Sequence, residues 1–221
     1  MDVLKFGGAS VNGPDAIRNM AEILSGFNKT SPLVIVTSAM GKSTNALEKV
    51  VSAFMYQKED PFILLANIKN EYLSTAKNLI SEDEDLLAKI NDLFVEAEWV
   101  LEDEVHDSYD YIYDQIVSIG ELVSTRIIAA YLKKRGFPVV WLDARDFIFT
   151  NENYRAAEIM WEITESKIKK SVERKFSDPT WILTQGFIGG TMDNNTTTLG
   201  REGSDYSAAI LAFCLNAERV I

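Results

Sequence analysis

The sequence predicts an α/β protein with a mainly parallel, open sheet that helices cover on both faces. Short runs rich in β-branched and aromatic residues, such as 33–36, 139–142 and 181–183, read as buried strands. Segments with apolar residues at helical spacing lie between them. Strands that alternate with helices in this way are typical of a three-layer αβα sandwich. An apolar content of 47% over 221 residues is enough for such a core.

The first third of the chain begins this alternation. Pro14 suits a first helical turn, and Ile17, Met20, Ala21 and Leu24 fall on one face of the helix that follows. The expected order is a strand at 3–6, a loop at 7–10, a helix at 14–27, a strand at 33–36, a loop at 38–44 and a helix from about 45.

The middle of the chain, about 60–115, is expected to be a helical insertion packed on the sheet layer, because apolar residues from Leu86 to Leu101 repeat every three or four positions. The expected elements after it are a helix at 119–134 closed by Gly136, a strand at 139–142, a helix at 156–175, a strand at 181–183, a turn-rich hairpin at 185–199, a helix at 204–215 and a strand from 218. Because the chain ends as this strand begins, we expect residues 1–221 to be a truncated domain. Its exposed edge should pair with another chain.

Composition excludes several classes of function. A net charge of −11 argues against nucleic-acid binding, and no long apolar run suggests a signal peptide or a membrane span. The one cysteine allows no internal disulfide, which fits the cytoplasm. A catalytic triad or a histidine-rich zinc site would depend on His106, the one histidine, which has no motif around it. Gly41-Lys42-Ser43 suggests a P-loop, but Val36 stands where that motif needs a glycine.

The segment 200–205, Gly-Arg-Glu-Gly-Ser-Asp, is the most informative motif. Glycines flank Arg201 at a turn, and Ser204-Asp205 begins an apolar helical run. A helix N-terminus attracts anions, and a guanidinium can bind a carboxylate or phosphate with two hydrogen bonds. An ordinary N-capped surface helix would explain the same pattern, but three other segments favour the same chemistry.

Lysine and glycine at the end of the first strand form the second motif. Lys5 is followed by Gly7 and Gly8, and ligands of open α/β sheets lie beyond the carboxyl ends of the strands. Glycine amides can approach phosphate oxygens closely, while the lysine neutralises a transferring phosphoryl group. A surface lysine in a strand-exit turn is the plainer interpretation.

The other two segments supply polar groups for a substrate. Ser38 and Thr44 lie in a loop of small residues after the second strand, and Glu121 is expected in the first turn of the helix that follows Gly120. A helix dipole alone would explain a glutamate there. Facing a pocket, Glu121 would instead bind an ammonium group, so a nucleotide and an amino acid are the matching ligands.

These motifs, in this order, resemble those of aspartate kinases in the amino acid kinase family. Lys5-Phe6-Gly7-Gly8-Ala9-Ser10 is similar to the K-F-G-G-T-S opening, and Gly120-Glu121 with Ser124 is similar to G-E-x-x-S. The segments 36–45, 185–189 and 196–205 resemble the second loop, G-F-I-G and T-T-T-L-G-R-G-G-S-D. The resemblance spans the whole chain and implies a carbamate kinase-like sandwich.

The resemblance also implies a reaction and its residues. The reaction would be phosphorylation of the L-aspartate side-chain carboxylate by ATP to 4-phospho-L-aspartate, the first step toward lysine, threonine and methionine. Mg²⁺ would be held through the nucleotide phosphates, and the full-length enzyme would be a homodimer. Lys5 and Asp205 would be catalytic, with Asp205 orienting Lys5. The phosphate contacts would come from Lys5, Gly7, Gly8 and Ser10. The aspartate contacts would come from Ser38, Thr44, Glu121, Arg201 and Ser204, with Glu121 near the α-amine and Arg201 on the α-carboxylate.

The chain departs from the family pattern in two positions and in length. Glu202 replaces a glycine, where a positive φ would strain it, and Ala9 replaces a threonine. The remaining nucleotide-binding segment and the regulatory ACT domains of the family have no counterpart, so we expect weak aspartate binding and slow or no turnover by residues 1–221. The alternatives are a kinase of glutamate, acetylglutamate or a nucleoside monophosphate, and an inactive substrate-binding fragment.

Overall fold

The computed structural model describes residues 1–81, 83–102, 106–172, 175 and 180–221. The helices are α1 (Pro14–Ser25), α2 (Ser43–Tyr56), α3 (Pro61–Ile80), α4 (Glu84–Glu102), α5 (Tyr109–Lys134), α6 (Trp161–Ser171) and α7 (Gly203–Cys214), with 3-10 turns η1 (Gly8–Val11) and η2 (Ala144–Asp146). The strands are β1 (Asp2–Phe6), β2 (Leu33–Thr37), β3 (Val139–Trp141), β4 (Trp181–Gln185), β5 (Ile188–Gly190), β6 (Thr196–Thr198) and β7 (Arg219–Val220).

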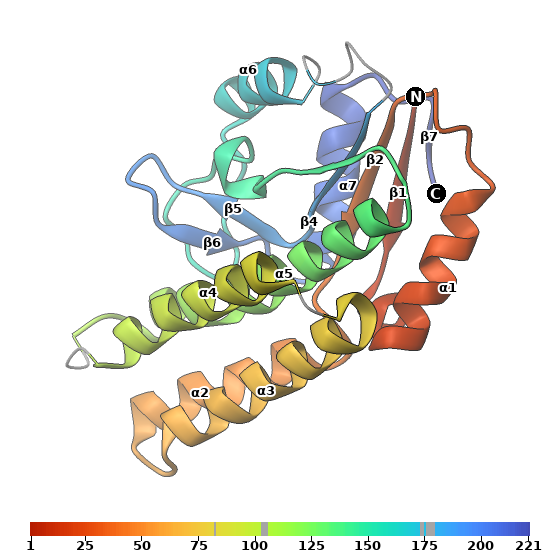
Figure 1. The fold of residues 1–221 in the computed structure, drawn as a ribbon. Coiled ribbons are helices and arrows are strands. Elements are labelled where there is room, and N and C mark those ends of the chain that lie inside the picture. The colour runs from red at the N-terminus through yellow and green to blue at the C-terminus, as the bar shows by residue number, and fades with distance from the viewer. Residues whose placement is uncertain (82, 103–105, 173–174, 176–179) are drawn as a thin grey trace.

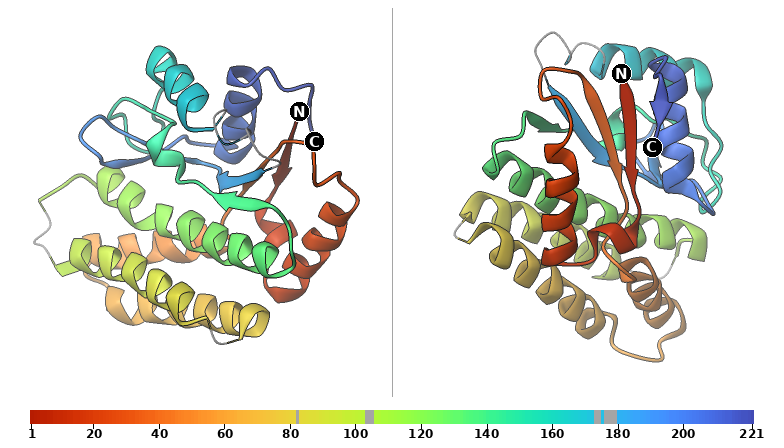
Figure 2. Two further views of the ribbon diagram at one scale, coloured as in Figure 1. Left: turned by 45° about the horizontal axis from the view of Figure 1, so that its top comes forward. Right: turned by 90° about the vertical axis from the view of Figure 1, so that its right-hand side faces the viewer.

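The central sheet has five strands in the order β3-β4-β2-β1-β7, and every pairing in it is parallel. Helices α1 and α7 lie on opposite sides of this sheet (Figure 2). β5 and β6 form a separate antiparallel hairpin, as predicted. The predicted α/β class with a mainly parallel sheet is therefore confirmed. β7 lies at the edge, where Val220 and Ile221 are 54% and 56% exposed.

A layer of helices packs below the carboxyl ends of the strands. In this layer α2 contacts α3 and α5, and α4 contacts α3 and α5 (Figure 1). The helical insertion expected at about 60–115 corresponds to α3, α4 and the start of α5, with residues 82 and 103–105 outside the described part. Among the described residues α5 is long and apolar enough to cross a membrane, but 83% of its apolar window is buried in the fold. Core packing explains that composition.

The predicted start of α5 is wrong by ten residues. The helix begins at Tyr109 rather than at 119, and the Ser108 side chain caps it by accepting a hydrogen bond from the Tyr111 N–H at 3.2 Å. Aromatic and β-branched residues in 109–118 weaken the local helix signal, and burial of this segment compensates for that. Gly120 and Glu121 consequently lie in mid-helix, where no helix N-terminus stabilises a carboxylate.

The predicted start of α6 is also wrong. The helix begins at Trp161 rather than at 156, because the preceding residues form sheet-like hydrogen bonds instead. The Ala157 N–H donates to the Thr198 carbonyl at 3.0 Å, and the Met160 N–H donates to the Phe149 carbonyl at 2.9 Å. Residues 173 and 174 of the predicted helix lie outside the described residues. The expected closure of α5 by Gly136 is confirmed, since this glycine has φ +76°.

Candidate active site

A cavity of about 310 Å³ lies where β1, β2 and β4 end. The strand register pairs Phe6 with Thr37 and Thr37 with Gln185, so the loops that follow these strands meet at one edge of the sheet. We call it the strand-end cavity. Eight residues that the sequence singled out line it: Lys5, Gly7, Gly8, Ser38, Thr44, Glu121, Ser204 and Asp205.

Lys5 and Asp205 form an ion pair in this cavity. The Lys5 Nζ lies 3.0 Å from the Asp205 Oδ1, although one residue is in β1 and the other is in the first turn of α7. The lysine side chain is 23% exposed and the aspartate side chain 62%. Asp205 therefore holds the ammonium at the mouth of the cavity.

Glycine is required where the first loop crosses the second. A Cβ on Gly8 would lie 2.8 Å from the Ala39 carbonyl oxygen, closer than real Cβ atoms approach backbone. The Gly8 carbonyl accepts a hydrogen bond from the Gly41 N–H at 2.9 Å, which fixes the two loops together. The pair of glycines thus brings Lys5 and Ser38 to the same opening.

Serine hydroxyls join the second loop to α7. The Ser38 Oγ donates to the Ser204 Oγ at 2.9 Å, and the Ser124 Oγ on α5 donates to the Ser38 carbonyl at 3.2 Å. A Cβ on Gly186 would lie 2.6 Å from the Ser204 Cβ, so this close approach needs a glycine after β4. Ser124 belongs to the G-E-x-x-S motif, which was the signal for its position.

Glu121 is the one buried acid of the cavity, and its side chain is incompletely satisfied. The residue is 3% exposed, and its Oε2 atom has no hydrogen-bond partner. Burial raises the pKa of this carboxyl to about 8, while the Ala39 backbone N–H and the Lys5 ammonium act in the opposite direction. A buried acceptor without a partner is costly, so the site is suited to a ligand that brings a donor.

Tyr72, on α3 of the helical layer, contacts residues next to the cavity. The sequence did not predict this contact. Its hydroxyl lies within hydrogen-bond distance of the Ser43 Oγ, at 2.9 Å, and of the Gly120 carbonyl, at 3.2 Å. Ser43 precedes Thr44 and Gly120 precedes Glu121, so α3 fixes two segments that line the cavity. Burial raises the pKa of Tyr72, which keeps the phenol protonated.

Two residues that line the cavity have strained backbones. Glu202 has φ +58° and Phe187 has φ +72°, in the left-handed region that favours glycine. The strain expected at Glu202 is therefore present. Phe187 was missed by sequence reasoning. Such strain concentrates at functional sites, where the surrounding structure maintains it.

Two sequence-predicted residues do not line the cavity. Arg201 is exposed and forms no ion pair with any described residue, although its neighbours Gly200 and Glu202 line the opening. Ser10 is exposed, and its N–H donates to the Gly7 carbonyl at 2.8 Å within η1. The roles that the resemblance gives to Lys5, Glu121 and Arg201 need one common cavity, which Lys5 and Glu121 line and Arg201 does not.

The described residues contain no group of three His, Cys, Asp or Glu side chains that could hold a metal ion. Within the cavity the acidic residues are Glu121, Glu202 and Asp205, and His106 lies outside it. Binding of Mg²⁺ through nucleotide phosphates stays a prediction.

Residues 2–221 match the model of the amino acid kinase family, and the chain belongs to that family. Its resemblance to aspartate kinases extends to individual relatives. The chain is 31% identical to aspartokinase 1 of Arabidopsis thaliana, over 99% of its own length and 39% of that protein. It is also 31% identical to the lysine-sensitive aspartokinase 3 of Escherichia coli, over 99% of its own length and 47% of that protein.

Solved structures agree in fold with this assignment. A structure of E. coli aspartokinase III in complex with aspartate and ADP has a TM-score of 0.88 at 30% identity, and one with lysine and aspartate has 0.87 at 31%. Each comparison covers all of this chain and 48% of the solved chain. The chain therefore spans about half the length of the relatives that it matches, or less.

Proposed function

We propose that this chain forms the aspartate-binding and phosphoryl-positioning part of an aspartate kinase. The observation that carries the proposal is the buried Glu121 carboxyl group, whose Oε2 has no hydrogen-bond partner, in a cavity that Lys5 also lines. A ligand ammonium would ionise this group on binding. An acceptor beside a cation suits a ligand that carries both an ammonium group and an anionic group. A free amino acid meets this requirement, and the aspartate and ADP bound by the E. coli relative fit the same chemistry.

The proposed reaction transfers the γ-phosphoryl group of ATP to a side-chain oxygen of L-aspartate. The carboxylate oxygen forms a bond to the γ-phosphorus as the bond to the β–γ bridging oxygen breaks, and ADP leaves. The side-chain carboxylate is already ionised at neutral pH, so no general base is needed. Catalysis then depends on positioning and on neutralising charge.

Each residue of the site has a proposed part in that reaction. Lys5, oriented by Asp205, neutralises the transferring phosphoryl group, and the Gly7 and Gly8 amides approach its oxygens. Glu121 binds the α-ammonium. The Ser38, Thr44 and Ser204 hydroxyls position the side-chain carboxylate. The ATP phosphates would bring Mg²⁺ with them.

Arg201 and Ser10 can reach the ligand in this proposal only if the backbone around them moves. Arg201 would turn from solvent onto the α-carboxylate when aspartate binds, which requires the 200–203 turn to move. Ser10 would contact phosphate only if η1 shifts. The phospho-aspartate formed would feed lysine, threonine and methionine synthesis.

A substrate panel tests the proposal. The chain should release ADP from ATP, or bind substrate detectably, with L-aspartate in preference to L-glutamate and N-acetyl-L-glutamate. The acetylated compound is the sharpest comparison, because its amide nitrogen carries no charge for Glu121 to bind. Equal responses to aspartate and acetylglutamate would contradict the proposal and favour an acetylglutamate kinase instead.

A further inference from the structure

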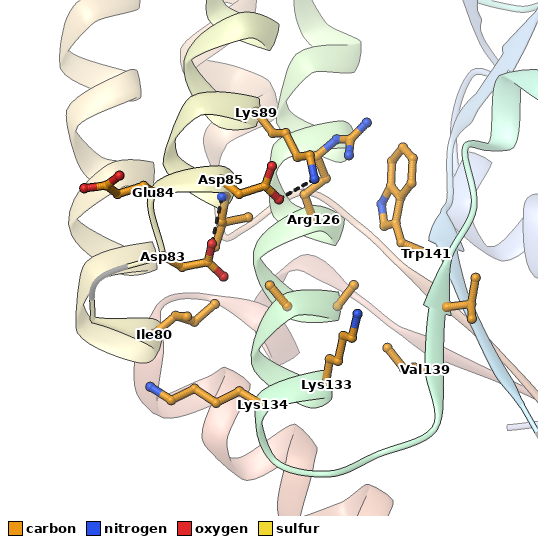
Figure 3. A pocket seen from close by; sticks show the side chains of 14 residues that line it. Ile80, Asp83, Glu84, Asp85, Lys89, Arg126, Lys133, Lys134, Val139 and Trp141 are labelled. Atoms are coloured by element: carbon orange, nitrogen blue, oxygen red, sulfur yellow. Dashed lines mark hydrogen bonds and ion pairs between the residues drawn. The ribbon is translucent and has the colours of Figure 1, made fainter.

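A second cavity lies apart from the strand-end cavity. It is a cleft of about 900 Å³ between the α3–α4 turn, the C-terminal half of α5 and the edge strand β3 (Figure 3). We call it the α4–α5 cleft. It shares no lining residue with the strand-end cavity, and the proposed phosphoryl transfer does not use it.

The charged lining of this cleft differs from the rest of the chain. Four cationic and three acidic side chains line it, whereas the whole chain carries a net charge of −11. The cationic residues are Lys89, Arg126, Lys133 and Lys134. The cleft is thus less acidic than the rest of the protein, with one more cation than acid in its lining, and anions approach it more easily than the remaining surface.

Two of the three acids of the cleft form contacts at the start of α4. The Asp83 carboxylate accepts a hydrogen bond from the Leu86 N–H at 3.0 Å, and Asp85 forms an ion pair with Lys89 (Figure 3). Glu84 lies in the first helical turn. By contrast, Arg126, Lys133 and Lys134 form no ion pair with any described residue. Among the described residues, three cations of the lining and two acids, Asp83 and Glu84, are therefore not in an ion pair, so the charge that a ligand meets is slightly positive.

The Arg126 guanidinium is oriented so that it can bind a planar anion. Its guanidinium carbon lies 3.8 Å from the centroid of the Trp141 ring, and its buried Nε has no hydrogen-bond partner. The nearby Asp143 already binds Arg145 at 2.7 Å. Stacking occupies the face of a guanidinium and leaves its in-plane N–H donors for a carboxylate or phosphate.

Trp141 is itself fixed, so the stacked pair is preorganised. The Trp141 Nε1 donates to the Thr125 Oγ1 at 2.9 Å, and the Thr125 Oγ1 donates to the Glu121 carbonyl at 2.9 Å. Gln185 at the end of β4 also donates to this hydroxyl, at 2.7 Å. A ligand would find the ring and the guanidinium already in place, which lowers the entropic cost of binding.

We propose that the α4–α5 cleft binds a small polyanion with two or more carboxylate or phosphate groups. One anionic group is bound by the in-plane N–H donors of Arg126, whose guanidinium stacks on the Trp141 ring, and the other lies beside Lys133, two turns further along α5. The volume accommodates a ligand of metabolite size. Both kinds of anion satisfy the same donors, so the test includes one of each.

The experiment titrates the whole chain with citrate and, separately, with inorganic pyrophosphate at constant ionic strength, by calorimetry. Arg126→Gln should weaken binding at least about tenfold, since it removes a charge-assisted pair. Lys170→Gln is the matched control, because it removes one exposed positive charge from α6, outside the cleft, and should change nothing. Trp141→Phe keeps a ring and should cost less than Arg126→Gln.

Three further variants complete the test. If Arg126→Gln does not fold by circular dichroism, Arg126→Lys and Lys133→Gln replace it, and each should weaken binding. Lys5→Met removes the other candidate anion site and should leave citrate binding intact. Tighter binding of citrate than of pyrophosphate assigns the cleft to carboxylates, and the reverse assigns it to phosphates. The proposal is overturned by binding that survives in Arg126→Gln, by binding lost in Lys5→Met, or by no anion binding at millimolar concentration.

Discussion

The Lys5 ammonium lies 3.0 Å from the Asp205 carboxylate, which joins the first strand of the chain to the last helix across 200 residues of sequence. The contact places the first turn of α7 next to the carboxyl end of β1. It thereby brings the lysine motif and the arginine motif to one opening. Both partners are partly solvated, so the contact serves geometry more than stability.

Replacing Asp205 by asparagine should therefore affect function more than folding. We expect the free energy of unfolding to change by less than about 1 kcal/mol, because solvent screens an exposed pair. Aspartate-dependent ADP release should fall at least about tenfold, since Lys5 loses its orienting partner. Urea denaturation and a coupled ADP assay measure the two effects. The same substitution at Asp15, which pairs with the exposed Arg18, is the control and should affect neither.

Glu121 should give the protein a distinctive pH dependence of stability. Its folded pKa of about 8 lies above the ordinary value of 4.5, so the folded state holds a proton that the unfolded state releases between these values. The stabilisation from this proton is complete below pH 4.5 and is lost as pH rises through 8. The shift corresponds to at most about 5 kcal/mol.

Glu121→Gln isolates this effect, because the amide does not titrate. The free energy of unfolding of the wild type, minus that of the variant, should fall steadily between about pH 5.5 and pH 8.5. Other groups, such as Asp114, whose pKa burial raises to about 6, titrate in both proteins and cancel. Parallel stability curves for the two proteins would show that Glu121 is ionised at neutral pH despite its burial.

Arg201 tests whether the 200–203 turn rearranges on binding. The side chain is exposed in this structure, yet the resemblance assigns it to the α-carboxylate of aspartate. If it turns inward, Arg201→Ala should weaken aspartate binding by roughly 2–4 kcal/mol, because a desolvated charge pair is lost. A loss below about 0.5 kcal/mol by calorimetry, as expected of a surface residue, would remove Arg201 from the site.

Glu202 should be a source of strain that glycine relieves. Its φ of +58° suits glycine, so Glu202→Gly should raise the free energy of unfolding by about 0.5–1 kcal/mol. Glu202→Ala removes the same carboxylate without relieving the backbone and should not stabilise the protein. If both variants are stabilised equally in urea, charge at the cavity rather than backbone strain is the cause.

Motif residues at strand ends were predictable from the sequence, whereas their surroundings were not. Lys5 lies near the end of the first strand, Ser38 follows the second strand, and Ser204 lies at the start of a helix. In a parallel sheet these positions come together at one edge, so their proximity could be predicted. Tyr72 is one of several apolar positions on the long helix α3. Its neighbours in the sequence do not indicate that its hydroxyl forms hydrogen bonds to the site. The burial of Glu121 was hidden because tertiary packing extends α5 by ten residues that have weak helix propensity.

The direction in which an exposed side chain points could not be predicted from the sequence either. The arginine motif placed the 200–205 turn at the cavity, but an exposed turn does not determine which way a long side chain such as Arg201 points. The start of α6 was mispredicted for a related reason. Residues 156–160 have helical spacing, and the hydrogen bonds that Thr198 and Phe149 offer them come from distant parts of the chain.

The recognition of an amino acid's ammonium group by Glu121 is tested most directly with two ligands that differ only in that group. Calorimetric titrations of the wild type and of Glu121→Gln with L-aspartate and with succinate should show that the wild type prefers aspartate at least about tenfold, since a buried charged pair forms. The preference should vanish in Glu121→Gln, and aspartate binding to the wild type at pH 7 should release close to one proton as Glu121 ionises. Equal affinity of the wild type for succinate and aspartate, without proton release, would contradict the account.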